Sequence, residues 1–414
     1  TPSRSSAASD VYKRQKSMSD FVETKSKFFL PKGVIYLDGN SLGPLPISAQ
    51  KRVEHTLNNE WGEMIVTGWN KAGWMEQPNK VGNRIARLIG AAENTITVGD
   101  TLTIKVFQAL ASAVKHQRNR KILLTDSSNF PSDIYAAQGL VNMMGPDYAL
   151  NIVPTDKLIE NINENVAAIF FTEVDYKTGR RYETQNILTA AKKSGALVIL
   201  DLAHSAGAID TNLTELDVDL AVGCTYKYLN GGPGSPAFTY VNPKLINSLD
   251  PCLSGWLGHE KPFDFSLQYN PAVGIDRMRV GTPPVIGLAA LEASLDIWDK
   301  VNISDVRRAS IDLTEQFIKG VERYCPMLSL ITPRNPKNRG SQVSFSFQHG
   351  YAAMQACIEQ GLIGDFRAPD VMRFGFTPLF IDADDVERAI AILTQIMSRK
   401  LWQDPKFQKR KKVT

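Results

Sequence analysis

The stretch LVILDLAHSAGAID, at residues 197–210, joins a short apolar run to a carboxylate, Asp201, and to a histidine, His204, three positions later. Apolar runs of this length that are rich in β-branched residues are typical of strands buried on both faces, as in a parallel sheet. The run therefore predicts a buried strand that ends at Asp201. We expect His204 in the turn that leaves this strand.

Three further runs have the same character: KILLT (121–125), AAIFFT (167–172) and DLAVG (219–223). Helix-length amphipathic segments lie between the runs, for example 103–116 and 186–194. Such alternation is typical of an α/β domain, in which ligands bind at the carboxyl ends of the strands. We therefore predict a mostly parallel central sheet flanked by helices.

The pattern changes after about residue 285. Helices are predicted at 285–299 and 303–324, a half-buried strand at 342–347, and a last helix at 384–399. This order indicates a smaller α+β C-terminal domain. The predicted division is a tail at 1–16, an N-terminal segment near the site mouth at 17–50, a large domain at 51–285, the small domain at 286–405 and a basic tail at 406–414.

Composition limits the classes of protein to which the chain can belong. Its 414 residues are 43% hydrophobic and 22% charged, as in an ordinary globular protein. The net charge of +4, from 47 basic and 43 acidic residues, is too small an excess to indicate a nucleic-acid-binding surface. No run reaches the roughly 18 apolar residues of a membrane helix, and no signal peptide is expected.

The cysteines point to a reducing compartment. There are four of them, none in a CxxC pair, so neither a disulfide framework nor a zinc site is predicted. We therefore expect a cytoplasmic protein that binds no metal ion, no nucleic acid and no membrane.

A lysine lies in a second informative stretch, DLAVGCTYKYLNGGPGSP at 219–236. Lys227 follows a predicted strand and precedes a glycine-rich loop, 26 residues after Asp201. A lysine amine can form a Schiff base with the aldehyde of pyridoxal phosphate, and a buried carboxylate keeps the ring nitrogen of that cofactor protonated. Alone, the aspartate is more often a helix cap and the lysine a surface residue. Together with His204 and the glycine loop, they favour pyridoxal 5′-phosphate as the cofactor.

Two other segments meet the remaining needs of such a cofactor. VGDTLTIKVFQAL (98–110) predicts a helix that opens at Leu102 and Thr103, and backbone N–H groups at a helix start bind phosphate. SSNFPSD (127–133) offers Phe130 to cover the ring. The same segment offers Ser132 and Asp133 as polar contacts.

Taken together, these motifs resemble the kynureninase family, which belongs to the class V aminotransferase-like enzymes of fold type I. The resemblance rests on YLDGNSLGPLP, FPSD, DLAH, YKYLNGGPG, GWLGHE, TPP and RFGFTPLF, which occur in this order between residues 36 and 380. A general aminotransferase shares the aspartate and the lysine but not this set. The resemblance implies a pyridoxal-phosphate-dependent hydrolase that cleaves L-kynurenine to anthranilate and L-alanine. Its reaction would serve tryptophan degradation, the synthesis of anthranilate-derived metabolites or NAD synthesis.

The resemblance also implies the site residues. The cofactor contacts would be Leu102, Thr103, Phe130, Pro131, Ser132, Asp133, Thr172, Asp201, His204, Tyr226, Lys227, Trp256 and Thr282. Lys227 would bond to the cofactor and then act as general base, and Asp201 would face the ring nitrogen. Tyr226 would be the acid–base group for the carbonyl steps, with a purely phosphate-binding tyrosine as the alternative. In this family Trp256 and Thr282 come across a subunit interface, which implies a homodimer with residues of both subunits in each site.

The substrate contacts follow from the same resemblance. Arg373, which opens RFGFTPLF, would clamp the α-carboxylate, a role that guanidinium geometry suits. Asn40 and Ser41, in DGNSLG, are expected to line the mouth of the site.

Specificity for the aryl ring depends on a third group of residues. Trp69 is expected to pack on the ring, with a core position as the alternative. Animal-type members carry a polar pair where this chain has Gly281 and Thr282, and a histidine where it has Trp69. The resemblance therefore implies that kynurenine is a better substrate than 3-hydroxykynurenine, as in bacterial members.

Three alternatives remain open on the residues alone. A cysteine desulfurase or selenocysteine lyase needs a thiolate on a mobile loop, and Cys357 is the one cysteine in a suitable region, although YAAMQACIEQG predicts a helix with a buried thiol. An aminotransferase would need a keto-acid co-substrate. An inactive cofactor-binding scaffold protein would be expected to lack at least one of Lys227, Asp201, Tyr226 and Arg373, and all four are present.

Overall fold

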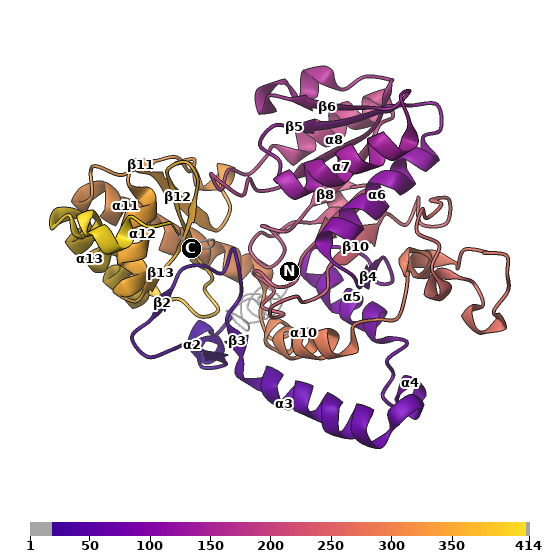
Figure 1. Cartoon of the computed structure of the whole chain (residues 1–414), viewed down its shortest axis with the longest axis horizontal. Coiled ribbons are helices and arrows are strands. Elements are labelled where there is room, and N and C mark those ends of the chain that lie inside the picture. The colour runs from indigo at the N-terminus through magenta and orange to yellow at the C-terminus, as the bar shows by residue number, and fades with distance from the viewer. Residues whose placement is uncertain (1–18, 411–414) are drawn as a thin grey trace, which may run out of the picture.

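Seven strands form the largest sheet in the computed structural model, which describes residues 19–410 (Figure 1). In spatial order they are β4 (Ile96–Val98), β10 (Phe238–Val241), β9 (Leu220–Gly223), β8 (Leu197–Asp201), β7 (Val166–Thr172), β5 (Ile122–Asp126) and β6 (Ala149–Val153). The pairs from β9 across to β6 are parallel, whereas β10 runs antiparallel to β4 and β9. The predicted α/β fold with a mostly parallel sheet is confirmed.

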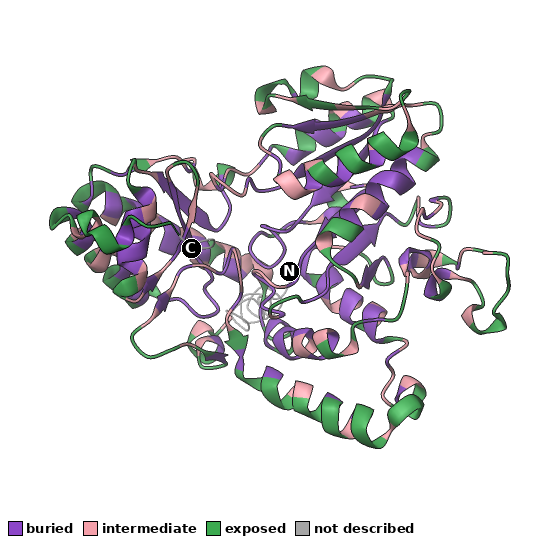
Figure 2. Ribbon diagram, viewed as in Figure 1, coloured by how far each residue is buried: buried purple, intermediate pink, exposed green. Residues whose placement is uncertain are grey.

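Helices cover both faces of this sheet because its buried strands alternate between two cores. In β8, Leu197 and Ile199 pack into the core below α6 and α7, whereas Val198 and Leu200 pack into the core on the opposite face. Figure 2 shows the inner strands as buried and the outer helix faces as exposed, whereas the edge strand β6 is mostly exposed. The helices of this domain are α5 (Gln77–Leu88), α6 (Leu102–His116), α7 (Pro131–Met144), α8 (Thr184–Ser194), α9 (Leu213–Leu216) and α10 (Val285–Trp298).

A second, antiparallel sheet forms the smaller domain. Its strands lie in the order β11 (Ser329–Leu330), β12 (Gln342–Ser346), β15 (Val371–Gly375) and β14 (Asp365–Arg367). Three helices belong to this domain: α11 (Ile303–Tyr324), α12 (Gly350–Glu359) and α13 (Ala383–Ser398). The predicted boundary at residue 285/286 stays a prediction, and α10 packs on α5 of the large domain and on α3 (Ile47–His55).

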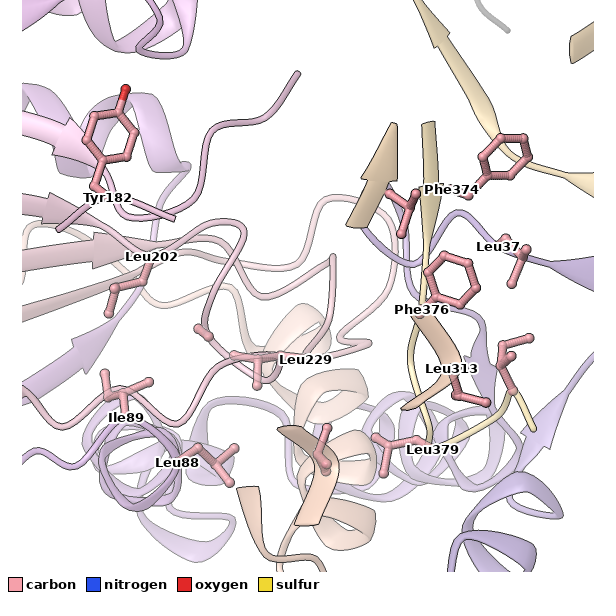
Figure 3. Packing of buried hydrophobic residues seen from close by; sticks show 14 of the residues in the cluster. Leu37, Leu88, Ile89, Tyr182, Leu202, Leu229, Leu313, Phe374, Phe376 and Leu379 are labelled. Atoms are coloured by element: carbon pink, nitrogen blue, oxygen red, sulfur yellow. The ribbon is translucent and has the colours of Figure 1, made fainter. Parts of the chain in front are cut away.

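The N-terminal segment ties the two domains together. Its elements are α2 (Phe21–Lys25), β1 (Phe28–Phe29), β2 (Ile35–Tyr36), β3 (Leu45–Pro46), α3 (Ile47–His55), a π-helix at Thr56–Glu63 and α4 (Gly68–Lys71). Strand β2 pairs in parallel with β13 (Leu362–Ile363) of the small domain, and β1 pairs with β3. One core runs through both domains: Leu37, Leu313 and Phe376 lie on the small-domain side of Figure 3, and Leu88 and Leu202 on the other.

Some predictions concern residues beyond this description. The tail predicted at 1–16 and the end of the basic tail, 411–414, lie outside the described residues. Within residues 19–410, no helix combines the length and apolarity needed to cross a membrane. In the same range, no group of three or more His, Cys, Asp or Glu side chains is placed to hold a metal ion.

Candidate active site

The carboxyl ends of the parallel strands bring the predicted cofactor residues together. Thr172 and Asp201 are the last residues of β7 and β8, and they lie opposite each other in the sheet. Lys227 follows the end of β9 by four residues. The Oγ1 of Thr172 donates to Asp201 Oδ2 at 3.4 Å, and the backbone N–H of Ala203 donates to Asp201 Oδ1 at 2.8 Å.

Asp201 shares a proton with a second buried carboxyl group, Asp133, on α7. Burial raises the pKa of both groups, but the charge of Asp201 and a hydrogen bond to it raise the pKa of Asp133 further. That same bond, with the Lys227 charge and the Ala203 N–H, opposes the rise at Asp201. These opposing effects favour the proton on Asp133 and the negative charge on Asp201.

Lys227 and His204 form the reactive contact. The Nζ of Lys227 lies 3.0 Å from His204 Nε2. Burial, with the charge of Lys227 as the second cause, holds the pKa of His204 well below its usual range, so the imidazole is neutral. A neutral imidazole accepts a hydrogen bond at only one nitrogen, so Nε2 accepts from Lys227. The other nitrogen, Nδ1, is buried and has no partner among the described residues.

An aromatic side chain stands over the lysine. The centroid of the Phe130 ring is 5.8 Å from Lys227 Nζ. Tyr176 meets Phe130 edge to face, with 5.1 Å between ring centroids and an interplanar angle of 87°. Phe130 keeps 37% of its surface exposed, so one side of the ring is available to a flat ligand.

The starts of two long helices meet beside this ring. Helix α6 begins at Leu102 and α7 at Pro131, and neither has a side-chain hydrogen bond that caps its first turn. Thr103 Oγ1 and Ser132 Oγ lie 2.9 Å apart and join the two starts. Free N–H groups at helix starts bind phosphate. The phosphate, the ring and the aldehyde of pyridoxal phosphate thus all find suitable groups here, and the site fits this cofactor.

Arg373 approaches from the small domain and is only 1% exposed. It lies on β15 opposite Asp365 of β14, whose carboxylate accepts from its Nε at 2.6 Å and also from Nη2. Nη2 donates to Ser41 Oγ at 3.0 Å, and Nη1 donates to the carbonyl of Tyr176. Through Tyr176, Arg373 is linked to Phe130 and hence to Lys227.

The N-terminal motif closes against the lysine turn. The Gly43 N–H donates to the Tyr226 carbonyl at 2.7 Å, and a Cβ on Gly43 would come within 2.7 Å of the Lys227 carbonyl oxygen. Ser41 reaches Arg373, as expected. Asn40 is fully buried against Gly375 of β15, so it does not line an open mouth in this chain.

Two predicted aromatic residues pack outside this cluster within one chain, and Gly281 and Thr282 border the start of α6. Trp69, on α4, meets Trp74 edge to face, and Figure 1 shows α4 at the far end of α3 from the small domain. Trp256 is 39% exposed and contacts Phe263. Gly281 and Thr282 are exposed and line a small hollow with residues at the start of α6.

Several residues of the site were not predicted. Asn129 accepts a hydrogen bond from Thr172 at 2.7 Å, and Tyr176 holds both Phe130 and Arg373. Asp38, Asp365 and Arg367 surround Arg373. The segment DFR, with two charges two positions apart in a strand, offered a signal for the last two because they share one face.

The thiol that a cysteine desulfurase would need is not available. Cys357 lies on α12 with no exposed surface, and burial raises the pKa of its thiol. A buried, protonated thiol is a poor nucleophile. This interpretation therefore receives no support from the structure.

Comparison with known proteins places these residues in context. A family model described as the kynureninase C-terminal domain matches residues 306–393. The kynureninase of Pseudomonas fluorescens is 44% identical over 397 residues, which cover 94% of this chain and 95% of that protein. The kynureninase of Burkholderia mallei is 42% identical over 398 residues, again covering 94% and 95%.

Solved structures with similar folds are more distant in sequence. A cysteine desulfurase from Thermococcus onnurineus NA1 has a TM-score of 0.77 at 18% identity and covers 92% of this chain and 99% of its own. A variant of the lyase C-DES, with glycine linked covalently to its PLP cofactor, has a TM-score of 0.73 at 18% identity, covering 88% and 97%. At these identities the likeness shows a shared fold alone.

Proposed function

The chain belongs to the kynureninase family, and on that premise we propose that it cleaves L-kynurenine with water to give anthranilate and L-alanine. It is a pyridoxal-phosphate-dependent hydrolase with the fold type I architecture. The observation that carries the proposal is the 3.0 Å contact between Lys227 and His204 beside Asp201, at the carboxyl edge of the sheet. Asp201, Lys227 and Tyr226 are the catalytic residues of the proposal.

The cofactor supplies an aldehyde that bonds to an amine and a ring that accepts the electrons released at the substrate α-carbon. The single negative charge of Asp201 favours a protonated ring nitrogen. The helix starts at Leu102 and Pro131 would hold the phosphate. The neutral His204 orients Lys227 Nζ, which takes the α-proton as general base.

Tyr226 is suited to act as an acid at the substrate carbonyl. Burial, followed by the neighbouring Cys224, raises the pKa of its hydroxyl. The hydroxyl therefore keeps its proton near neutral pH and can donate it to a carbonyl oxygen on which negative charge develops. Gly43 fixes the backbone of Tyr226 from the other side, through its N–H.

We assign Arg373 and Ser41 to the substrate α-carboxylate, and Trp69 and Gly281 to the aryl ring. Gly281 has no side chain and Trp69 offers one N–H, so a ring hydroxyl gains few partners. We therefore propose that kynurenine is preferred over 3-hydroxykynurenine. Measured values of kcat/KM for the two substrates test this, and a ratio that favours the hydroxylated form would reject it.

We propose a homodimer with shared sites, because Trp69 and Trp256 pack on Trp74 and Phe263 within one chain and not on the Lys227 cluster. Large apolar side chains are also exposed near them, as expected of a surface that a second copy covers: Trp61, Ile65, Val66, Phe263, Phe265 and Leu267. Mixing inactive Lys227→Ala and Trp256→Ala subunits should restore about a quarter of the sites, because each mixed dimer contains one intact site. No recovery after verified subunit exchange would exclude shared sites.

The cellular setting is a proposal of the same kind. All four cysteines, among the residues that the structure describes, are free thiols. Free thiols suit a reducing compartment, so we place the protein in the cytoplasm. The product would serve tryptophan degradation or NAD synthesis.

The proposed function has a direct test. Holoenzyme with L-kynurenine should release fluorescent anthranilate without any added keto acid, whereas Lys227→Ala should not. Cys357→Ala should behave as the native protein, because that thiol is buried in α12. A holoenzyme that binds pyridoxal phosphate but releases no anthranilate would refute the proposal, and a need for a keto acid would indicate an aminotransferase.

A further inference from the structure

Four charged side chains meet where the small domain faces the site: Asp38, Asp365, Arg367 and Arg373. Asp365 and Arg373 lie opposite each other on β14 and β15, and Arg367 is two residues from Asp365 along β14. The Oδ2 of Asp365 lies 2.8 Å from Arg367 Nη2 and also accepts from Arg373. One carboxylate therefore pairs with two guanidinium groups.

Arg373 alone has little left to offer an anion. Of its five N–H groups, two go to Asp365, one to Ser41 and one to the Tyr176 carbonyl. An isolated pair of Arg373 and Asp365 would also carry no net charge. Such a pair attracts a carboxylate only weakly, because the attraction of the cation is offset by the repulsion of the anion.

Arg367 changes that balance. Its side chain is 36% exposed, against 3% for Asp365, so it lies between Asp365 and the solvent. Its charge also reaches the site, since Arg373 and Arg367 both help to lower the pKa of His204 after burial and Lys227. Two guanidinium groups and one carboxylate leave a net charge of +1.

The fourth group, Asp38, does not cancel this charge near neutral pH. Burial, and then the charge of Asp365, raise the pKa of Asp38 to about 8 against the opposing effect of Arg373 and Arg367. Its Oδ1 is shielded from water and has no hydrogen-bond partner within the described part of the chain. The tyrosines that face the cluster are uncharged because burial raises their pKa values: Tyr36, Tyr176 and Tyr228.

We infer that Arg367 is a positioning residue for the substrate α-carboxylate, which it serves through Asp365. By sharing Asp365 it leaves Arg373 with an uncompensated positive charge, while Asp365 keeps that guanidinium in a fixed orientation. Arg373 then offers its one remaining N–H group, on Nη1, and Arg367 supplies the charge that makes the cluster a receptor for one carboxylate. The inference rests on the proposed function, since the anion is the carboxylate of its amino-acid substrate.

A charge series at Arg367 tests this role. Arg367→Gln should raise KM for L-kynurenine and Kd for L-alanine about tenfold with little change in kcat, the effect of losing one partly exposed charge. Arg367→Lys, which keeps the charge, should change both by less than about threefold. The double variant Arg367→Gln with Asp365→Asn should recover most of the lost affinity, because Arg373 again carries an uncompensated charge.

Matched controls separate this role from a structural one. Arg388 pairs with the nearly buried Asp385 on α13 in the same way, so Arg388→Gln removes an equivalent ion pair away from the site. Arg388→Gln should leave KM for L-kynurenine and Kd for L-alanine unchanged. Arg367→Gln should likewise not change the affinity for the decarboxylated amine analogue of kynurenine, which has no α-carboxylate. Calorimetric binding of L-alanine to the holoenzyme measures the effect without turnover. If anthranilate is never formed, the proposed function fails, and L-alanine binding still tests Arg367.

Two outcomes would overturn the inference. An affinity for L-alanine that is the same in Arg367→Gln and in the native protein would show that the charge is not used. A double variant no better than Arg367→Gln, with both folded by thermal unfolding, would show that charge balance is not the mechanism.

Discussion

Two charge clusters flank the lysine, and they handle charge in opposite ways. In the large domain, the carboxyl groups of Asp133 and Asp201 share one proton and leave one negative charge. In the small domain, the guanidinium groups of Arg367 and Arg373 share the carboxylate of Asp365 and leave one positive charge. Each cluster thus presents a single charge to one end of the site.

The difference lies in access to solvent. Asp133 and Asp201 are 2% and 4% exposed, and Asp201 accepts hydrogen bonds from Ala203 and from Thr172 of the neighbouring strand. The small-domain cluster reaches solvent through Arg367, at 36%. A cluster closed to water keeps a constant charge for a resident cofactor, whereas a cluster that reaches water can exchange one substrate after another. Perturbations of the first should change kcat, and perturbations of the second should change KM.

The largest effect is expected between the clusters, at Lys227. Lys227→Met should lower kcat by on the order of 10⁴-fold, because the variant loses both its general base and its covalent bond to the cofactor. Single-turnover anthranilate fluorescence measures the residual rate. Cofactor should remain bound through Asp201 and the two helix starts, which its absorbance spectrum checks. A kcat within tenfold of the native value would show that Lys227, between the two clusters, is not the catalytic base.

The fold was predictable because its signals are local. The runs at 121–125, 167–172, 197–201 and 219–223 all became strands of the central sheet, since each is apolar enough to be buried on both faces. The predicted helix at 303–324 matches α11 (Ile303–Tyr324). The short strands β13 and β14 were not predicted, because they have too few residues to show the alternation of apolar and polar side chains that marks a strand.

The two clusters differed in how far sequence reasoning could reach them. Asp201 and Asp133 stand at a strand end and a helix start, which sequence patterns mark directly. Arg373 was assigned by resemblance. Its pairing with Asp365 depends on the register of β14 against β15, and the sequence of either strand alone does not determine that register. Asp38 lies more than 300 positions away in the chain and reaches the cluster through the pairing of β2 with β13 and through its bridge to Gly375.

The second prediction concerns the hydrogen bonds of the positive cluster. Arg373→Lys should raise KM for L-kynurenine about 100-fold, because a lysine keeps the charge but loses the planar set of donors that Asp365, Ser41 and the substrate share. The change in kcat should be much smaller. Initial rates over a range of L-kynurenine concentrations measure both constants. Equal falls in kcat and kcat/KM would place Arg373 in the chemical step. The positive cluster would then affect kcat, as the negative cluster is expected to do.

The third prediction tests the position of the proton in the negative cluster. Asp133→Ala should lower kcat about tenfold, because Asp201 loses a donor and gains a space that water can enter. Asp133→Asn should lower it by less than about threefold, since an amide N–H replaces the carboxyl O–H as donor. Steady-state kinetics at fixed pH compare the two variants. An Asn variant as impaired as the Ala variant would mean that Asp133 must ionise.

The smallest effect is expected from Asp38, the group on which the positive cluster depends for its net charge. As the pH rises through about 8, Asp38 ionises, the net charge falls from +1 to zero, and KM for L-kynurenine should rise about threefold. Asp38→Asn cannot ionise at this position, so its KM should stay constant over the same pH range.

The stability of the protein gives an independent measurement of the same ionisation, and the sign of its pH dependence is defined. Because the pKa of Asp38 is raised on folding, its contribution is complete below about pH 4 and declines until about pH 8. The free energy of unfolding of the native protein should therefore fall relative to Asp38→Asn across this interval, as urea titrations can measure. A difference that grows in the opposite direction would show that Asp38 is ionised at neutral pH, and the positive cluster would then carry no net charge for the substrate.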